Sequence, residues 1–207
     1  MISVLITAYK EDKTIAKCIQ NIADAQYSGI PSNFEIMLAC PDDATLNAAQ
    51  EQIKKMGLES KFVFLRDPGK GKPTALNMLM DKAKGDIWIL TDGDVYFGEN
   101  AVANLIKHFE DSGVELVTGR PKSADSKDTM MGYFGHLLSD AANHKRNVDL
   151  TNTPAGKGMT FVKKRSFFPV SGYIYAIRKT DIRFPADCLV DDAYVSYVVH
   201  NNGGKIE

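Results

Sequence analysis

Cysteine and histidine are scarce in this sequence of 207 residues, which contains three cysteines and four histidines. Cys18, Cys40 and Cys188 lie far apart and form no C-x-x-C pair, so the sequence predicts neither a disulfide framework nor a thiolate metal site. We expect free, mainly buried thiols in a reducing compartment. The histidines are equally scattered, which argues against a zinc centre.

Long apolar runs and a charge imbalance are also missing. No stretch approaches the ~20 consecutive apolar residues that a membrane-spanning helix needs. Met1 leads directly into the strand-like segment 2–7 rather than into a signal peptide. The net charge of −1 provides no basic field that would gather nucleic acid. We therefore expect a cytoplasmic protein that binds no nucleic acid.

The first 120 residues repeat a rhythm of short apolar run, polar turn and amphipathic segment. Strand-like runs occupy 2–7, 34–39, 62–65, 87–90 and 114–118. Between them, apolar residues recur with helical spacing, as at Ile15, Ile19 and Ile22. Strands that are apolar throughout and alternate with amphipathic helices indicate an α/β fold, in which helices flank a mainly parallel central sheet.

Beyond Arg120 the rhythm changes. The pattern predicts a polar connection at 121–128, a helix at 129–146, an irregular segment at 147–169, a strand at 173–177 and a helix from Asp191. The chain stops at "GGKIE", where another strand begins, so we expect further protein beyond residue 207.

Polar residues follow each of the first four predicted strands. They are 7–11 after the first strand, "PDD" (41–43) after the second, "RDPGKGKPTALN" (66–77) after the third and "TDGD" (91–94) after the fourth. Because ligands bind beyond the carboxyl ends of parallel strands, these residues predict a ligand site at one edge of the sheet.

Three common nucleotide-binding motifs are absent. The first strand–helix turn, "TAYKED", has no glycine, which excludes both the G-x-G-x-x-G fingerprint and the glycine-rich turn of a sugar nucleotidyltransferase. A P-loop would require a glycine in place of Arg66 and a serine or threonine in place of Pro73.

Asp92 and Asp94 leave an apolar strand together, separated by one glycine. Carboxylates are ligands that Mg²⁺ and Mn²⁺ prefer, and such a cation would relieve their repulsion while still binding a diphosphate. Lys70 and Lys72 are candidates to neutralise the charge on a departing diphosphate. The alternative is a simple Asp-Gly-Asp turn, which the polar residues at the other strand ends disfavour.

Four segments, taken in order, resemble the family 2 glycosyltransferases of the GT-A fold. They are "ISVLITAYKEDKTIAKCIQNI", "GKGKPTALNMLMDKAKGDIWILTDGDV", "VSGYIYAIRK" and "VDDAYVSYVVHNNGGKI". The resemblance implies one Rossmann-like domain over 1–207, with a donor-binding half at 1–120 and an acceptor-binding half at 121–207. It also implies metal-dependent, inverting transfer of a sugar from a UDP- or GDP-sugar to a saccharide or lipid-linked acceptor.

The resemblance assigns donor contacts to residues at the strand ends: Thr7, Ala8, Tyr9, Glu11, Asp42, Lys72 and Asp92. Residues 7–11 match the segment that holds the base and ribose, Asp42 the aspartate that hydrogen-bonds the base, and Lys72 a basic group near the nucleotide. Asp94 matches the direct metal ligand of the D-x-D pair, with Asp92 closer to the ribose. Mg²⁺ or Mn²⁺ is the implied cofactor.

On the acceptor side the resemblance points to Gly172 and to "VDD" at 190–192. Asp192 matches the general base of the family's "ED" motif, while Asp191 replaces the usual glutamate, which leaves a swap of their roles open. From the residues alone, an aspartate at a helix start is also a common cap. One aspartate can therefore cap the helix while the other acts as the base.

Two other functions stay open at this stage: nucleotide-sugar binding without catalysis, and metal-dependent pyrophosphate hydrolysis. A pure binder has no use for Asp192, whose presence favours an enzyme. The basic and aromatic segment 161–170 fits either an anionic membrane surface or a solvated turn beside core phenylalanines. Peripheral association with a cytoplasmic membrane face and the oligomeric state therefore stay open too.

Overall fold

The computed structural model describes residues 1–24, 28–147 and 169–207. The chain divides into two units. The first combines Met1–Gly119 with Val170–Glu207, and the second is Arg120–Pro169.

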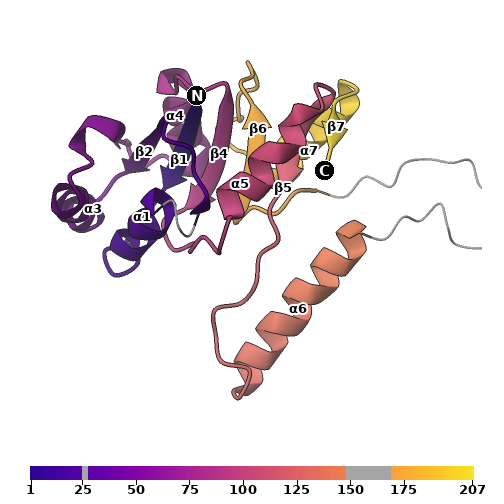
Figure 1. Ribbon diagram of the computed structural model, residues 1–207, viewed down its shortest axis with the longest axis horizontal. Helices are drawn as coiled ribbons and strands as arrows, with labels where there is room; N and C mark the ends of the chain where they lie inside the picture. Colours follow the sequence, from indigo (N-terminus) through magenta and orange to yellow (C-terminus); the bar gives the residue numbers. More distant parts are fainter. Residues whose placement is uncertain (25–27, 148–168) are drawn as a thin grey trace, which may run out of the picture. The chain divides into compact units, whose positions relative to one another are not determined.

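Within the described residues, a seven-stranded sheet organises the first unit in the order β3-β2-β1-β4-β6-β5-β7 (Figure 1). The strands are β1 (Ile2–Thr7), β2 (Phe34–Cys40), β3 (Phe62–Arg66), β4 (Ile87–Asp92), β5 (Val114–Thr118), β6 (Ile174–Arg178) and β7 (Lys205–Ile206). The first four strands run parallel, β6 is antiparallel to β4 and β5, and β7 is parallel to β5. The predicted α/β fold with a mainly parallel sheet is confirmed.

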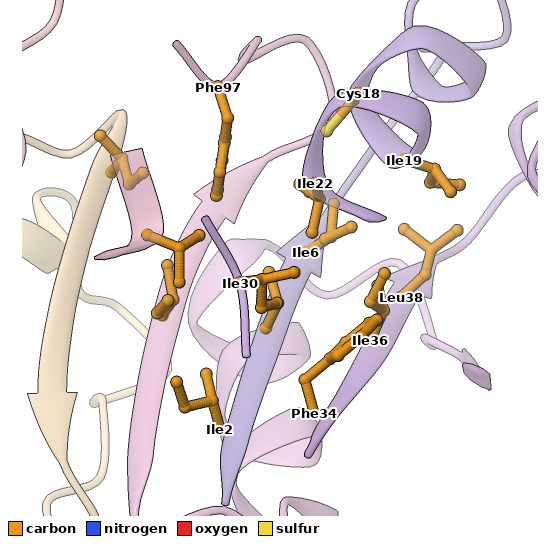
Figure 2. Packing of buried hydrophobic residues seen from close by; sticks show 14 of the residues in the cluster. Ile2, Ile6, Cys18, Ile19, Ile22, Ile30, Phe34, Ile36, Leu38 and Phe97 are labelled. Atoms are coloured by element: carbon orange, nitrogen blue, oxygen red, sulfur yellow. The ribbon is translucent and has the colours of Figure 1, made fainter. Parts of the chain in front are cut away.

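One face of the sheet is covered by α1 (Ile15–Ala23), α3 (Asp43–Met56) and α5 (Ala101–Ile106). Alternate strand residues point to this face, so Ile6 lies against Ile22 of α1 and Leu38 lies near Ile19 (Figure 2). These side chains are fully buried, and each contributes about 1.5–3 kcal/mol by leaving water. The spacing of apolar residues in α1 therefore reflects its packing on the sheet.

The opposite face is covered by α4 (Lys72–Lys82) and α7 (Asp191–Asn201). Leu76 of α4 and Val195 of α7 belong to the same buried cluster as Trp88 and Tyr175 of the sheet. The indole N–H of Trp88 donates to the carbonyl of Gly85 at 3.0 Å, which satisfies its polar atom in the core. This packing brings the N-terminal ends of α4 and α7 to the sheet.

One helix is shorter than its apolar spacing predicts. The helical spacing continues to Phe109, but α5 ends at Ile106 and continues as the 3₁₀ turn η2 (Lys107–Glu110). Arg178 donates hydrogen bonds to the carbonyls of Phe109 and Asp111, at 2.8 and 3.1 Å. These side-chain bonds supply partners for carbonyls at the end of the turn.

In the second unit, α6 (Met130–Asn147) confirms the helix predicted at 129–146. Its apolar side chains at Met130, Met131, Tyr133, Phe134, Leu137 and Leu138 are exposed. None of the helices in the described ranges is both long and apolar enough to cross a membrane. The predicted irregular segment at 147–169, with most of the basic run 161–170, lies outside the described residues.

The chain leaves and re-enters the first unit at neighbouring points. The N–H of Gly119 donates to the carbonyl of Ile174 at 2.9 Å. The N–H of Ser171 donates to Thr118 Oγ1 at 2.8 Å. The end of β5 and the start of β6 are therefore tied together.

A buried polar network closes the amino-terminal edge of the sheet, away from the predicted ligand site. Ser3 Oγ donates to Glu35 Oε1 at 2.5 Å and accepts from the N–H of Gly85 at 2.8 Å. Glu35 Oε1 also accepts from the N–H of Lys84 at 2.7 Å. Ser3 and Glu35 are buried, so each lost bond leaves a polar group without water.

We expect Ser3→Ala to lower the free energy of unfolding by about 1–3 kcal/mol. The substitution leaves the buried N–H of Gly85 without an acceptor and removes one hydrogen bond to Glu35. Urea denaturation monitored by circular dichroism measures this change. Ser32→Ala, at an exposed serine, is the control and should stay within about 0.5 kcal/mol of wild type. An equal unfolding midpoint for Ser3→Ala and wild type would contradict the role of this network.

Candidate functional site

The carboxyl ends of β1, β2 and β4 bring their last residues side by side. Thr7 pairs with Asp92 of β4 on one side and with Ala39 of β2 on the other. Thr7 Oγ1 donates to Asp92 Oδ1 at 3.1 Å. The strand pairing therefore fixes the first carboxylate of the D-x-D pair on the face of the sheet that carries α4 and α7.

A cavity of about 1000 Å³ opens at this edge. Its lining includes six of the residues predicted to contact the donor: Thr7, Ala8, Tyr9, Glu11, Lys72 and Asp92. Arg66 at the end of β3, with Pro41, Asp67 and Pro68 from the loops after β2 and β3, also lines it. The structure thus gathers most of the predicted donor residues around a single cavity, which is large enough for a nucleotide.

Asp42 is an exception, because it does not belong to that lining. It is the N-cap of α3, where its Oδ1 accepts from the N–H of Thr45 at 2.9 Å. Its Oδ2 accepts from the N–H of Lys10 at 2.9 Å. Burial opposes ionisation, but these backbone donors hold the pKa of Asp42 below its ordinary value. The geometry makes Asp42 a helix cap and gives no support to a contact with a base.

Lys72, in the first turn of α4, connects the two acidic motifs. Its Nζ lies 2.8 Å from Asp92 Oδ1 and 3.5 Å from Asp191 Oδ1. Burial alone would lower the pKa of Lys72, but the charges of Asp92 and Asp191 outweigh it and raise that pKa. Lys72 therefore stays an ammonium ion at neutral pH and holds the two carboxylates together.

Tyr175 of β6 is close enough to Asp191 to feel the charge of its carboxylate. Burial, and then the charge of Asp191, raise the pKa of the fully buried Tyr175 hydroxyl well above its ordinary value. Neither this hydroxyl nor Asp191 Oδ2 makes a hydrogen bond of standard geometry within the described chain. The hydroxyl is a possible donor and the carboxylate oxygen a possible acceptor, so the two groups are chemically complementary. Sequence reasoning missed Tyr175, since it sits in an apolar strand without any polar pattern.

Glu11 lies beneath the glycine of the D-x-D pair. A Cβ at Gly93 would collide with the Glu11 carboxylate, so only glycine leaves room for it. Burial, followed by the charges of Asp94 and Asp92, raises the pKa of Glu11 to about 7. Its Oε2 is buried and has no hydrogen-bond partner within the described ranges. Three carboxyl groups therefore converge at this turn, with Asp94 exposed to solvent.

The residues predicted to lie on the acceptor side meet where β6 and α7 begin. Thr91 Oγ1 donates to the carbonyl of Tyr173 at 2.9 Å, which ties this segment to the end of β4. A Cβ at Gly172 would lie 3.0 Å from Asp192 Oδ2, so this glycine leaves the space that Asp192 occupies. The structure thus brings together Gly172 and Asp192, two residues that the sequence resemblance predicts to share one site.

The first turn of α7 shows how the two aspartates differ. Val190 is the N-cap and makes no side-chain cap. Asp191 turns to Lys72, and its pKa is raised by burial against the opposing charge of Lys72. In the part of the chain that the structure describes, Asp192 Oδ1 accepts from the adjacent N–H of Ala193, at 2.8 Å. Neither aspartate is a conventional N-cap, and Asp191 is the one held by a cation.

The comparisons with known proteins agree with this geometry. The family model described as "Glycosyl transferase family 2" matches residues 3–178. A curated relative from Methanococcus voltae is 22% identical over 197 residues, which are 94% of this chain and 58% of the relative. It is named dolichyl N-acetyl-alpha-D-glucosaminyl phosphate 3-beta-D-2,3-diacetamido-2,3-dideoxy-beta-D-glucuronosyltransferase.

Two solved structures share the fold. A mannosyltransferase from Pyrobaculum calidifontis, in complex with GDP-Man and Mn²⁺, has a TM-score of 0.70 and 17% identity, covering 99% of this chain and 53% of that one. Glucosyl-3-phosphoglycerate synthase from Mycobacterium tuberculosis has a TM-score of 0.52 and 19% identity, covering 86% and 57%. This chain spans little more than half the length of the three proteins. Since the family match runs through most of its length, the chain belongs to glycosyl transferase family 2.

Proposed function

We propose that this chain catalyses the inverting transfer of a sugar from a UDP- or GDP-sugar to an acceptor hydroxyl, with the help of a divalent metal. The observation that carries the proposal is the contact of Lys72 with both acidic motifs. Because of this contact, Asp191 and Asp192 lie at the same edge of the sheet as Lys72, Asp92 and the nucleotide-sized cavity. Two solved structures of similar fold contain a nucleotide sugar with Mn²⁺, GDP-Man in one and UDP-glucose in the other.

The donor would lie in the cavity along the ends of β1 to β4. Tyr9 is exposed at the cavity and offers an aromatic face to a base. Asp92, held by Thr7 and Lys72, is placed to accept from a ribose hydroxyl. The ammonium of Lys72 is close enough to this position to stabilise negative charge on a diphosphate.

The residues at the D-x-D turn fit Mg²⁺ or Mn²⁺ in a site that the substrate completes. No group of three or more His, Cys, Asp or Glu side chains in the described chain is arranged as an all-protein metal site. Mg²⁺ usually takes one or two carboxylates and fills its shell with phosphates and water. Asp94 and Asp92 supply that number, and the buried Glu11 Oε2 beside them is a further oxygen without a hydrogen-bond partner among the described residues. When bound, the metal would neutralise charge on the leaving diphosphate.

Asp192 would take the proton of the acceptor hydroxyl. The acceptor oxygen forms a bond to the anomeric carbon while the bond from that carbon to the diphosphate oxygen breaks, and the proton passes to Asp192. An inverting displacement needs this base on the side opposite the leaving group. Lys72 pairs with Asp191 and leaves Asp192 as the aspartate without a cation partner among the described residues. This difference supports Asp192 as the base and Asp191 as an anchor for Lys72.

The surface beside Asp192 suits a saccharide or lipid-linked acceptor. Tyr173, Leu189 and Val190 are exposed next to Gly172 and the aspartate pair. Exposed aromatic and aliphatic side chains can bind the apolar face of a sugar or part of a lipid. The archaeal relative is named for a dolichyl phosphate-linked acceptor, which supports this class and association with a membrane surface; the cytoplasmic face is our proposal.

The metal-dependent donor site can be tested by calorimetric titration of UDP, GDP, ADP and CDP, each with Mn²⁺ or with EDTA. We expect micromolar binding of one nucleotide in Mn²⁺, and at least tenfold weaker binding with EDTA or in Asp94→Ala. Asp81→Ala, which removes an exposed salt bridge to Arg183, is the control and should bind normally. If folded wild type bound no nucleotide in Mn²⁺, the proposed donor site would have to be abandoned.

The assignment of the base predicts different outcomes for the two aspartates. Asp192→Asn should lower kcat for sugar transfer by about 100-fold or more without changing nucleotide affinity. Asp191→Asn removes a partner of Lys72 and should also weaken nucleotide binding. Transfer is measured from UDP- and GDP-sugars to a panel of saccharides and polyprenyl-phosphate saccharides. Nucleotide release that does not depend on acceptor would instead indicate a pyrophosphohydrolase.

Glu11 gives the site a distinctive dependence of stability on pH. The pKa of Glu11 rises from 4.5 to about 7 on folding, so between these values the folded chain binds more protons than the unfolded chain. The free energy of unfolding therefore falls as the pH rises through this window. In EDTA, Glu11→Gln should gain stability relative to wild type between about pH 5 and pH 8.

Urea denaturation at a series of pH values measures this gain. Glu51→Gln, at an exposed position of α3, is the matched control and should show no such trend. A difference between Glu11→Gln and wild type that is constant with pH would contradict the raised pKa of Glu11.

A further inference from the structure

We propose that Asp67 reads the base of the donor nucleotide, and that it selects a base whose edge carries a ring N–H beside a carbonyl, as guanine and uracil do. The inference rests on the proposed function, because it takes the cavity at the strand ends to be the nucleotide site. It assigns base selection to the loop after β3 instead of to Asp42.

Asp67 is a buried carboxylate in the wall of the cavity. It directly follows β3, and its N–H donates to the carbonyl of Cys40 at 3.3 Å, which fixes it beside the end of β2. Only 7% of the residue is exposed, yet it lines the cavity. Its position between the two strand ends places it with Pro41 and Pro68 in the lining of the cavity.

The carboxylate of Asp67 is poorly satisfied by the protein. Within the described chain, its one hydrogen bond runs from the N–H of Gly69 to Oδ1, at 2.7 Å. A carboxylate offers about four acceptor positions, and burial without partners is costly. Arg66 does not neutralise it, because its Nη1 pairs with Asp43 at 2.7 Å. Oδ2 of Asp67 is therefore left to accept from a ligand in the cavity.

Asp42 lacks this capacity. Both of its oxygens already accept backbone N–H groups, one of them from Lys10, which has a left-handed backbone with φ of 59°. A base that displaced either bond would uncap α3 or release this strained turn. Asp67 can instead bind a base without breaking any bond in the protein.

The chemistry of the bases decides which of them Asp67 accepts. A carboxylate only accepts hydrogen bonds, so it requires an N–H on the base edge. Guanine presents its ring N–H and an adjacent amino group, and uracil presents a ring N–H between two carbonyls. Adenine and cytosine also carry an amino group, which can donate to a carboxylate, but it stands where guanine and uracil have the carbonyl beside the ring N–H. With that position turned away from Asp67, they face the carboxylate with a bare ring nitrogen and its lone pair. Arg66 lines the same cavity and can donate to the neighbouring carbonyl of guanine or uracil.

Asp67→Asn tests this reading while keeping the local fold. The N–H of Gly69 needs an oxygen, so the amide oxygen takes the place of Oδ1 and the amide NH₂ takes the place of Oδ2. The cavity then presents a donor where it had an acceptor. We expect GDP or UDP to bind wild type at least tenfold more tightly than ADP and CDP in Mn²⁺. In Asp67→Asn the GDP-to-ADP or UDP-to-CDP affinity ratio should fall by about tenfold or more.

The experiment is calorimetric titration of the four nucleoside diphosphates in Mn²⁺ on wild type, Asp67→Asn and Asp42→Asn. Asparagine also caps helices well, so Asp42→Asn is a matched substitution and should keep the wild-type base preference. Preference for GDP identifies a purine site and preference for UDP a pyrimidine site; either supports the proposal if Asp67→Asn abolishes it.

Two results would overturn the proposal. One is a wild-type preference that survives in Asp67→Asn or is lost in Asp42→Asn, and the other is equal or tighter binding of ADP or CDP by wild type. Failure of the proposed function looks different, because then none of the four nucleotides binds wild type in Mn²⁺.

Discussion

The ammonium group of Lys72 is the charge on which the arrangement of this site depends. It reaches Asp92 at the end of β4 and Asp191 at the start of α7, two carboxylates that are far apart in the sequence and would otherwise repel each other. Because Lys72 begins α4, its two ion pairs fix the relation between one strand and two helices on the same face of the sheet. The D-x-D turn and the first turn of α7 thus share one cation, so a change in the charge of Asp92 alters the electrostatic environment of Asp191, and the reverse.

Much of the fold could be predicted because burial leaves a direct imprint on the sequence. Strands covered on both faces must be apolar throughout, so the runs that became β1, β2 and β4 are recognisable without any partner. The rule that parallel strands bind ligands beyond their carboxyl ends then groups Thr7, Lys72 and Asp92 correctly at one edge. The D-x-D pair could be found in the sequence for the same reason, since its charges follow a buried strand at once.

The remainder of the site depends on contacts that no local pattern records. Asp42 has the spacing of a helix cap with Thr45, but whether its second oxygen is available depends on the backbone of Lys10. Tyr175 faces Asp191 only because β6 enters the sheet antiparallel, between β4 and β5, so its direction and register choose the face. Asp67 follows a strand like the other site residues, but its burial, and its single side-chain hydrogen bond among the described residues, arise from the packing of the loops around it.

The neighbouring exit and re-entry points at Gly119 and Ser171 have a consequence for how proteins with this fold diversify. The ends of the excursion at Arg120–Pro169 are already joined by the sheet, so lengthening or replacing it adds only a slowly growing loop-closure entropy. Strand β4, which carries Asp92, and helix α7, which carries Asp192, would not need to move. The sheet edge can therefore keep its geometry while the excursion between β5 and β6 changes in length or sequence.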